Sequence, residues 1–111
     1  MDAELTKAFA FSASHRSGVR FIGANYILFL TLPALDEAAE KELDAVVQAE
    51  LIAKLHTRDL SDGVDFLKGV EITDAGLLRA FRERLEKPLA RHGLRRLALQ
   101  RDARTVTTLH V

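Results

Sequence analysis

The sequence predicts an α+β fold, in which two helices lie on one face of a four-stranded antiparallel sheet in the order ββααββ. Two hydrophobic patterns support this prediction. Apolar residues alternate with period two near both ends of the chain, which is typical of strands. In the middle they recur every 3.6 residues, which is typical of amphipathic helices. We expect a single domain over residues 1–111, because the chain has no linker, repeat or low-complexity segment.

The first two strands differ in how their apolar residues are distributed. Residues 4–15 place Phe9 and Phe11 on one face and small or polar residues on the other. Residues 20–32, which follow a short turn, are apolar on both faces until Pro33 ends the strand. A strand that is apolar on both faces has to be covered on both sides. We therefore expect a second subunit to cover the face that the helices leave open.

Each helix is predicted from its start and stop signals. Asp36 is the expected N-cap of the first helix, which extends to Leu55, and Thr73 that of the second, which Pro88 should end. On the first helix, two pairs of opposite charge stand four residues apart and should attract each other: Glu37 with Lys41, and Glu50 with Lys54.

The remaining segments complete the order of elements. Residues 57–72 are predicted to form the loop between the two helices. Leu94, Leu97 and Leu99 mark the third strand, a tight turn follows at 101–104, and β-branched residues indicate a fourth strand over 105–111. The fold class follows from these periodicities.

Composition excludes several classes of function. Sixteen basic and sixteen acidic residues cancel, which argues against broad attraction to nucleic acids or membranes. The absence of cysteine removes disulfides, thiolate metal ligands and cysteine nucleophiles. No apolar run is long enough to span a bilayer, and no signal peptide is recognisable. We expect a cytoplasmic protein.

Three short strings carry a family resemblance. They are "FSASH" at 11–15, "IGANYILFLTL" at 22–32 and "LHTRDLS" at 55–61. In this order and spacing, they resemble motifs of the 6-pyruvoyltetrahydropterin and 6-carboxytetrahydropterin synthase family. The resemblance implies the tunnelling fold, in which ββααββ subunits join their sheets around a ring, and hence a homo-oligomer.

The resemblance also locates the zinc ligands of the family. One histidine ends the first strand, and His15 occupies that place. The other two stand at i and i+2 on the second strand, where this chain has Ile22 and Ala24. Neither side chain can donate a lone pair, and an open zinc site needs about three protein ligands. We therefore expect no zinc and no other cofactor, with His15 as a relic of the site.

The other functional positions of the family are also changed. Gly18 stands where the catalytic cysteine would be, and His56 with Thr57 stands at the catalytic Asp–His pair, so that His56 is the one candidate catalytic residue. The carboxylate that anchors the pterin falls at Gln100 or Arg101. An arginine side chain carries only hydrogen-bond donors, so it cannot accept hydrogen bonds from a pterin as a carboxylate does. A glutamine side chain can accept one such bond.

The leading hypothesis is a divergent family member that does not run the zinc-dependent reaction. It would be an oligomeric binding or scaffold protein that keeps a pocket for a pterin-like or purine-like heterocycle between subunits. One alternative is an active lyase in which His15, His56 and Asp59 transfer protons. Another is a structural partner of a catalytic paralogue.

Simpler interpretations of the same residues remain open. His15 fits an ordinary polar strand end, and His56 fits a helix end at which it contacts the last carbonyl groups. A run of basic residues between positions 79 and 96 is typical of a solvated face, with phosphate binding as the less common alternative.

Overall fold

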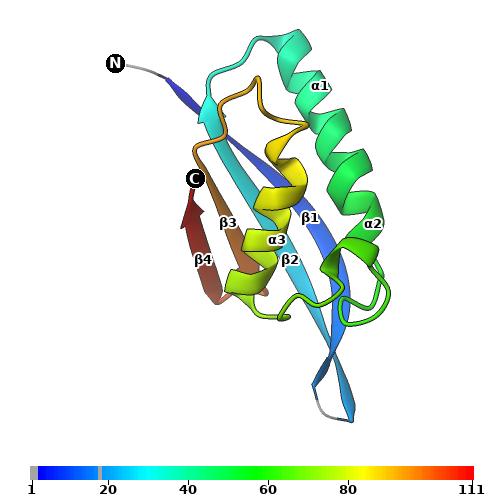
Figure 1. Ribbon diagram of the computed structural model, residues 1–111. Helices are drawn as coiled ribbons and strands as arrows, with labels where there is room; N and C mark the ends of the chain where they lie inside the picture. The colour runs from blue at the N-terminus through cyan, green and yellow to red at the C-terminus, as the bar shows by residue number, and fades with distance from the viewer. Residues whose placement is uncertain (1–2, 18) are drawn as a thin grey trace.

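The computed structural model describes residues 3–17 and 19–111, and it confirms the α+β fold and the order ββααββ. Four strands form one antiparallel sheet in the order β1-β2-β3-β4. Their bounds are Glu4–Ser17 for β1, Arg20–Pro33 for β2, Arg96–Arg101 for β3 and Thr105–His110 for β4. The two main helices, α1 (Glu37–Val47) and α3 (Asp74–Glu86), lie on one face of this sheet (Figure 1).

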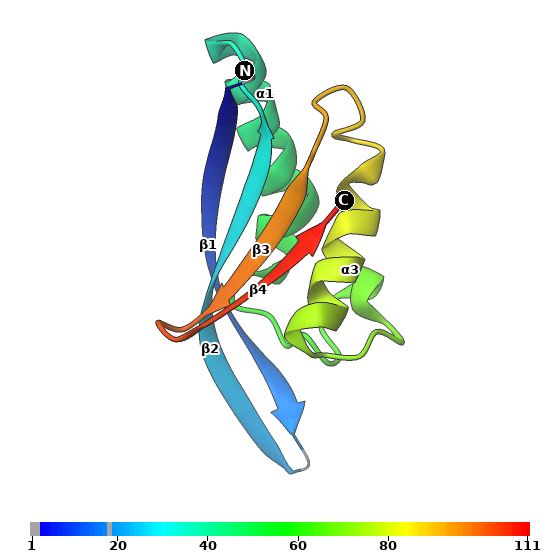
Figure 2. The ribbon, with the colours of Figure 1, turned by 90° about the vertical axis from the view of Figure 1, so that its left-hand side faces the viewer.

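The hydrophobic core lies between the helices and the sheet. Alternate residues of β1 and β2 are buried there, as the period of two predicts: Phe9, Phe11, Tyr26, Leu28, Leu30 and Leu32. The helices contribute Leu43, Leu77 and Phe81, among others. Among the described residues, no helix covers the opposite face of the sheet (Figure 2), and Ile27 and Phe29 on that face are partly exposed.

Both predicted helix caps are confirmed. The Asp36 carboxylate accepts a hydrogen bond from the Ala39 amide at 2.8 Å, and the Thr73 hydroxyl accepts one from the Gly76 amide at 3.0 Å. Each bond satisfies a donor that the first helical turn would leave without a partner. Helix α3 ends shortly before Pro88, also as predicted.

The first helix departs from the regular pattern in its second half. A π-helical turn, η1 (Gln48–Ile52), stands between α1 and the short α2 (Ala53–Leu55). Hydrogen bonds in a π-turn join residues five apart, so side chains four apart no longer lie one above the other. Such turns often occur at functional sites.

The π-turn changes one of the two predicted ion pairs. Glu37 and Lys41, in the regular α1, lie 3.5 Å apart as expected. The Glu50–Lys54 pair was predicted wrongly, because Glu50 lies within the π-turn and Lys54 follows it in α2. Glu50 instead places its Oε2 3.1 Å from Nη2 of Arg84 on α3.

The segment 57–72 is more ordered than a simple loop. It contains a short 3₁₀ helix, η2 (Asp65–Leu67), and its first residues run along the outer edge of β1. Three backbone hydrogen bonds join them to the strand: Thr57 N to Ser12 O at 2.6 Å, Ser14 N to Arg58 O at 3.0 Å, and Leu60 N to Ser14 O at 2.7 Å. This part of the β1 edge is therefore covered.

The β1–β2 hairpin extends beyond the helices (Figures 1 and 2). Near its end, the exposed fractions of Phe21 and Ile22 are 60% and 43%. Ile22 lies on the same strand face as the core residues, but the helices do not reach it. The turn was expected at residues 16–18, but Arg16 and Ser17 still belong to β1, and residue 18 lies outside the described residues. No helix among those described is long and apolar enough to cross a membrane.

Candidate functional site

The strand register brings together the three positions that the family resemblance assigns to zinc. His15 of β1 is directly opposite Ile22 of β2, and Ala13 is opposite Ala24. Opposed residues of an antiparallel pair share a face, as do residues two apart on one strand. His15, Ile22 and Ala24 are therefore neighbours on the core side of the hairpin.

This cluster does not fit a zinc ion. The metal takes nitrogen, sulfur or oxygen ligands, and catalytic sites use about three of them from the protein. His15 supplies one nitrogen, whereas Ile22 and Ala24 supply no donor. Across residues 3–17 and 19–111, no group of three or more histidine or acidic side chains is placed to hold a metal ion.

A cavity of about 280 Å³ adjoins His15, between the sheet and the start of α3. The register places Arg101 of β3 opposite Tyr26 of β2. Arg101 is therefore on the core face, together with Leu97 and Leu99. Seven residues line the cavity: His15, Tyr26, Ile72, Thr73, Asp74, Leu77 and Arg101.

An ion pair forms one wall of the cavity. Nε of Arg101 lies 3.5 Å from Oδ2 of Asp74, whose side chain is only 17% exposed. Asp74 is the first residue of α3, directly after the Thr73 cap. The positive end of the helix dipole favours a carboxylate at this position. The cavity thus combines an oriented acceptor with a guanidinium donor.

Two further polar residues line the same cavity. Tyr26 is 2% exposed, and its ring stacks on Phe11 with centroids 5.0 Å apart. Burial, with the Asp74 charge adding to it, raises the pKa of Tyr26, so its phenol remains protonated. Nδ1 of His15 is buried without a hydrogen-bond partner in the described structure.

Of the two predicted anchor residues, only Arg101 reaches the cavity. Gln100 is opposite Ile27 in the register and therefore lies on the other face of the sheet. Its Nε2 donates to the carbonyl of Asp102 at 2.9 Å. The face alternation of β3 separates these adjacent residues.

His56 does not belong to this site. Its Nδ1 accepts a hydrogen bond from the Ser12 backbone amide at 3.0 Å. The predicted contact with helix carbonyls is therefore replaced by one with the edge of β1. His56 is not among the residues that line the cavity beside His15, so the two histidines are not brought together there. Gly18, the position of the family's cysteine, lies outside the described residues.

Sequence reasoning did not single out Asp74 for this site. In the sequence, Asp74 is one of several acids near a helix start, where the dipole alone accounts for them. The signal was present in two parts: the Thr73 cap fixes Asp74 at the first helical position, and strand alternation directs Arg101 to the helix side of the sheet. What the sequence lacked was the register that places these two elements together.

Comparison with known proteins supports the fold. Neither a family model nor a curated protein sequence matches this chain, whereas thirteen chains of solved structures do. One is the 6-pyruvoyl tetrahydropterin synthase of Caenorhabditis elegans, with a TM-score of 0.75 and 18% sequence identity over 98% of this chain and 95% of that one. At this identity the likeness shows a common fold, that of a pterin synthase.

Proposed function

We propose that this protein is a zinc-free relative of the pterin synthases that binds a small heterocycle and does not run the family's zinc-dependent reaction. One observation carries the proposal. The strand register places His15 next to Ile22 and Ala24, so two aliphatic side chains occupy the positions where imidazoles would be needed. Without the metal, the chain lacks the Lewis acid of that reaction.

The cavity beside His15 suits a pterin-like or purine-like ring. An aminopyrimidinone edge presents adjacent N–H donors and a carbonyl oxygen. Asp74 can accept two hydrogen bonds from the donors, and Arg101 can donate to the carbonyl. Ile72 and Leu77 supply apolar contact for the ring. In this proposal, Asp74 provides the hydrogen-bond acceptor for the ring, which Arg101 is unable to provide.

The active-lyase alternative has less support. His56 is engaged by the Ser12 amide, and the cavity that His15 lines does not include it. A role as structural partner of a catalytic paralogue is tested separately, by asking whether such a paralogue purifies with the protein.

Asp74→Asn should weaken pterin binding by roughly tenfold or more, because a hydrogen bond to a charged group contributes about 1.5–3 kcal/mol. The measurement is a fluorescence titration with neopterin. Asp62→Asn is the matched control, since Asp62 is exposed in the 57–72 segment. Equal affinity in the parent and Asp74→Asn, or no binding by the parent at millimolar neopterin, would contradict this assignment.

We also propose that the protein is a homo-oligomer. The sheet face opposite the helices carries a patch of small and apolar side chains: Ala8, Ala10, Ile27, Phe29, Ala98 and Val106. The outer edge of β4 has no neighbour among the described strands. Open edges and uncovered apolar faces favour association with another chain.

Sedimentation velocity at micromolar concentration should show a discrete oligomer. Val106→Lys, which places a charge at a residue that is 58% exposed in the isolated chain, should shift the distribution toward monomer without unfolding it. A parent protein that sediments as a stable monomer would rule out the assembly.

A further inference from the structure

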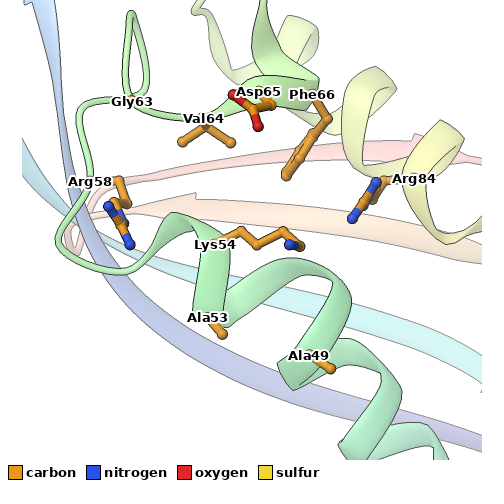
Figure 3. Close-up of a pocket in the computed structure, with 9 residues that line it drawn as sticks. All are labelled: Ala49, Ala53, Lys54, Arg58, Gly63, Val64, Asp65, Phe66 and Arg84. Atoms are coloured by element: carbon orange, nitrogen blue, oxygen red, sulfur yellow. The ribbon is translucent and has the colours of Figure 1, made fainter.

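The described part of the chain has a second, larger groove on the outer side of the helices (Figure 3). Its volume is about 740 Å³. One side of the groove is formed by η1 and α2, and the other by the segment that leads into η2. Nine residues line it: Ala49, Ala53, Lys54, Arg58, Gly63, Val64, Asp65, Phe66 and Arg84. His15, Asp74 and Arg101 are not among them, so the groove is separate from the cavity described above.

Positive charge converges in this groove. Figure 3 shows the charged ends of Lys54 and Arg84 directed toward each other beneath Phe66, with Arg58 on the opposite side. Within the residues that the structure describes, no acidic group lies within ion-pair distance of Lys54 or Arg58. Cations that face one another repel, and an anion between them would turn this repulsion into attraction.

The fold holds one of these cations in place. Nε of Arg84 donates to the carbonyl of Glu50 at 3.1 Å, while its Nη2 pairs with the carboxylate of the same residue. The guanidinium also lies 5.1 Å from the centre of the Phe66 ring. A positioned guanidinium loses little freedom when it binds an oxyanion. The π-turn that redirects Glu50 to Arg84 also leaves Lys54 available.

The groove also presents apolar side chains and is larger than a single oxyanion. Ala49 and Ala53 form a floor of small side chains, and Val64 and Phe66 form a wall. Its volume is in the range of pockets that bind small organic molecules. The carboxylate of Asp65 stands on the same wall as Phe66 and would repel a second anionic group.

We infer that this groove binds a small phosphorylated molecule, with a single phosphate between Lys54 and Arg84 and an apolar or aromatic body against Phe66. The balanced net charge of the chain favours such a ligand over nucleic acid, whose binding needs an extended basic surface. This inference is independent of the proposed function.

Calorimetric titration of the full chain with phenyl phosphate and with inorganic phosphate tests the inference. Phenyl phosphate should bind more tightly, because only it fills the apolar part of the groove. Lys54→Gln should weaken the binding of both phosphates by roughly tenfold, since it removes a charged hydrogen-bond donor. Phe66→Leu should weaken the binding of phenyl phosphate and leave that of inorganic phosphate unchanged. Lys68→Gln, at an exposed lysine outside the groove, is the matched control and should leave both affinities unchanged.

Several outcomes would overturn the inference. They are the absence of binding in the folded parent, an equal loss in Lys54→Gln and Lys68→Gln, or an unchanged affinity in Lys54→Gln. A third titrant, oligothymidylate, tests whether the groove binds nucleic acid rather than a small phosphorylated molecule. An affinity that rises with its length, and that exceeds the affinity for phenyl phosphate, would identify a nucleic-acid surface instead.

Discussion

Replacing Ile22 and Ala24 together by histidine is expected to create a zinc site that the parent protein lacks. The register places His15 opposite Ile22, and Ala24 follows two residues along the same face. Side chains directly opposed on an antiparallel pair have Cβ atoms about 5 Å apart. Three imidazoles at these positions can therefore approach one ion, which is the ligand number of an open zinc site.

The cost to folding should be modest. A fully buried isoleucine would be expensive to replace, but Ile22 is 43% exposed near the end of the hairpin. Zinc binds the neutral form of imidazole, so protons compete with the metal below the ordinary histidine pKa of about 6.5. Zinc affinity in the double variant should accordingly be present at pH 7.5 and be lost as the pH falls below about 6.

Elemental analysis after dialysis against zinc, without chelator, measures the effect. The parent should retain well under one zinc per chain, and the double variant should retain about one. Gly23→His with Asn25→His is the matched control, because these residues alternate with Ile22 and Ala24 and direct imidazoles to the opposite face. We expect no catalysis from the double variant, because the position that the resemblance assigns to the catalytic cysteine holds Gly18.

The two possible failures are distinguishable. A full complement of zinc in the parent would contradict the proposed function. A folded double variant with no more zinc affinity than the control variant would instead show that His15 is not aligned with this part of β2. The interpretation of Ile22 and Ala24 as replaced ligands would then have to be abandoned.

Local patterns were sufficient to predict most of the fold. Alternation placed Phe9 and Phe11 together on one strand face, which is buried in the structure. The short polar side chains of Asp36 and Thr73, directly before the helical periods, identified them as caps. These features depend on residues close together in sequence. The choice between Gln100 and Arg101 stayed open in the sequence, and the register of β3 against β2 places Arg101 on the helix side.

The missed features depend on contacts between distant segments. Nothing in residues 48–52 distinguishes a π-turn from a regular helix, and Glu50 finds Arg84 only after α3 has docked. His56 contacts the Ser12 amide through a pairing of 57–60 with β1 that no periodicity indicates. The candidate site required the same kind of information, because it joins three strands to the start of α3.

The start of α3 offers a sharp test of that packing, because Gly76→Ala should destabilise the protein. Alanine in place of glycine normally stabilises a helix by about 1 kcal/mol. Here, however, a Cβ atom at position 76 would lie 2.1 Å from the carbonyl oxygen of Glu71 and 3.1 Å from the Thr73 hydroxyl. The backbone that precedes α3 must move, and the Thr73 cap is disturbed with it. Overpacking costs about 1–3 kcal/mol and the loss of a cap about 1 kcal/mol.

We expect a net loss of about 1–3 kcal/mol in the free energy of unfolding, measured by urea denaturation, and a Tm lower by roughly 5–10 °C. Gly23→Ala is the matched control, since no atom lies within 4 Å of its added Cβ, and it should change stability by less than about 0.5 kcal/mol.

The displaced segment carries Ile72, Thr73 and Asp74, which form one wall of the cavity. Gly76→Ala should therefore also weaken neopterin binding under conditions where the variant remains folded. If Gly76→Ala were instead as stable as an ordinary glycine-to-alanine helix variant, Glu71 could not lie against α3 as described, and the wall that holds Asp74 beside Arg101 would have to be placed differently.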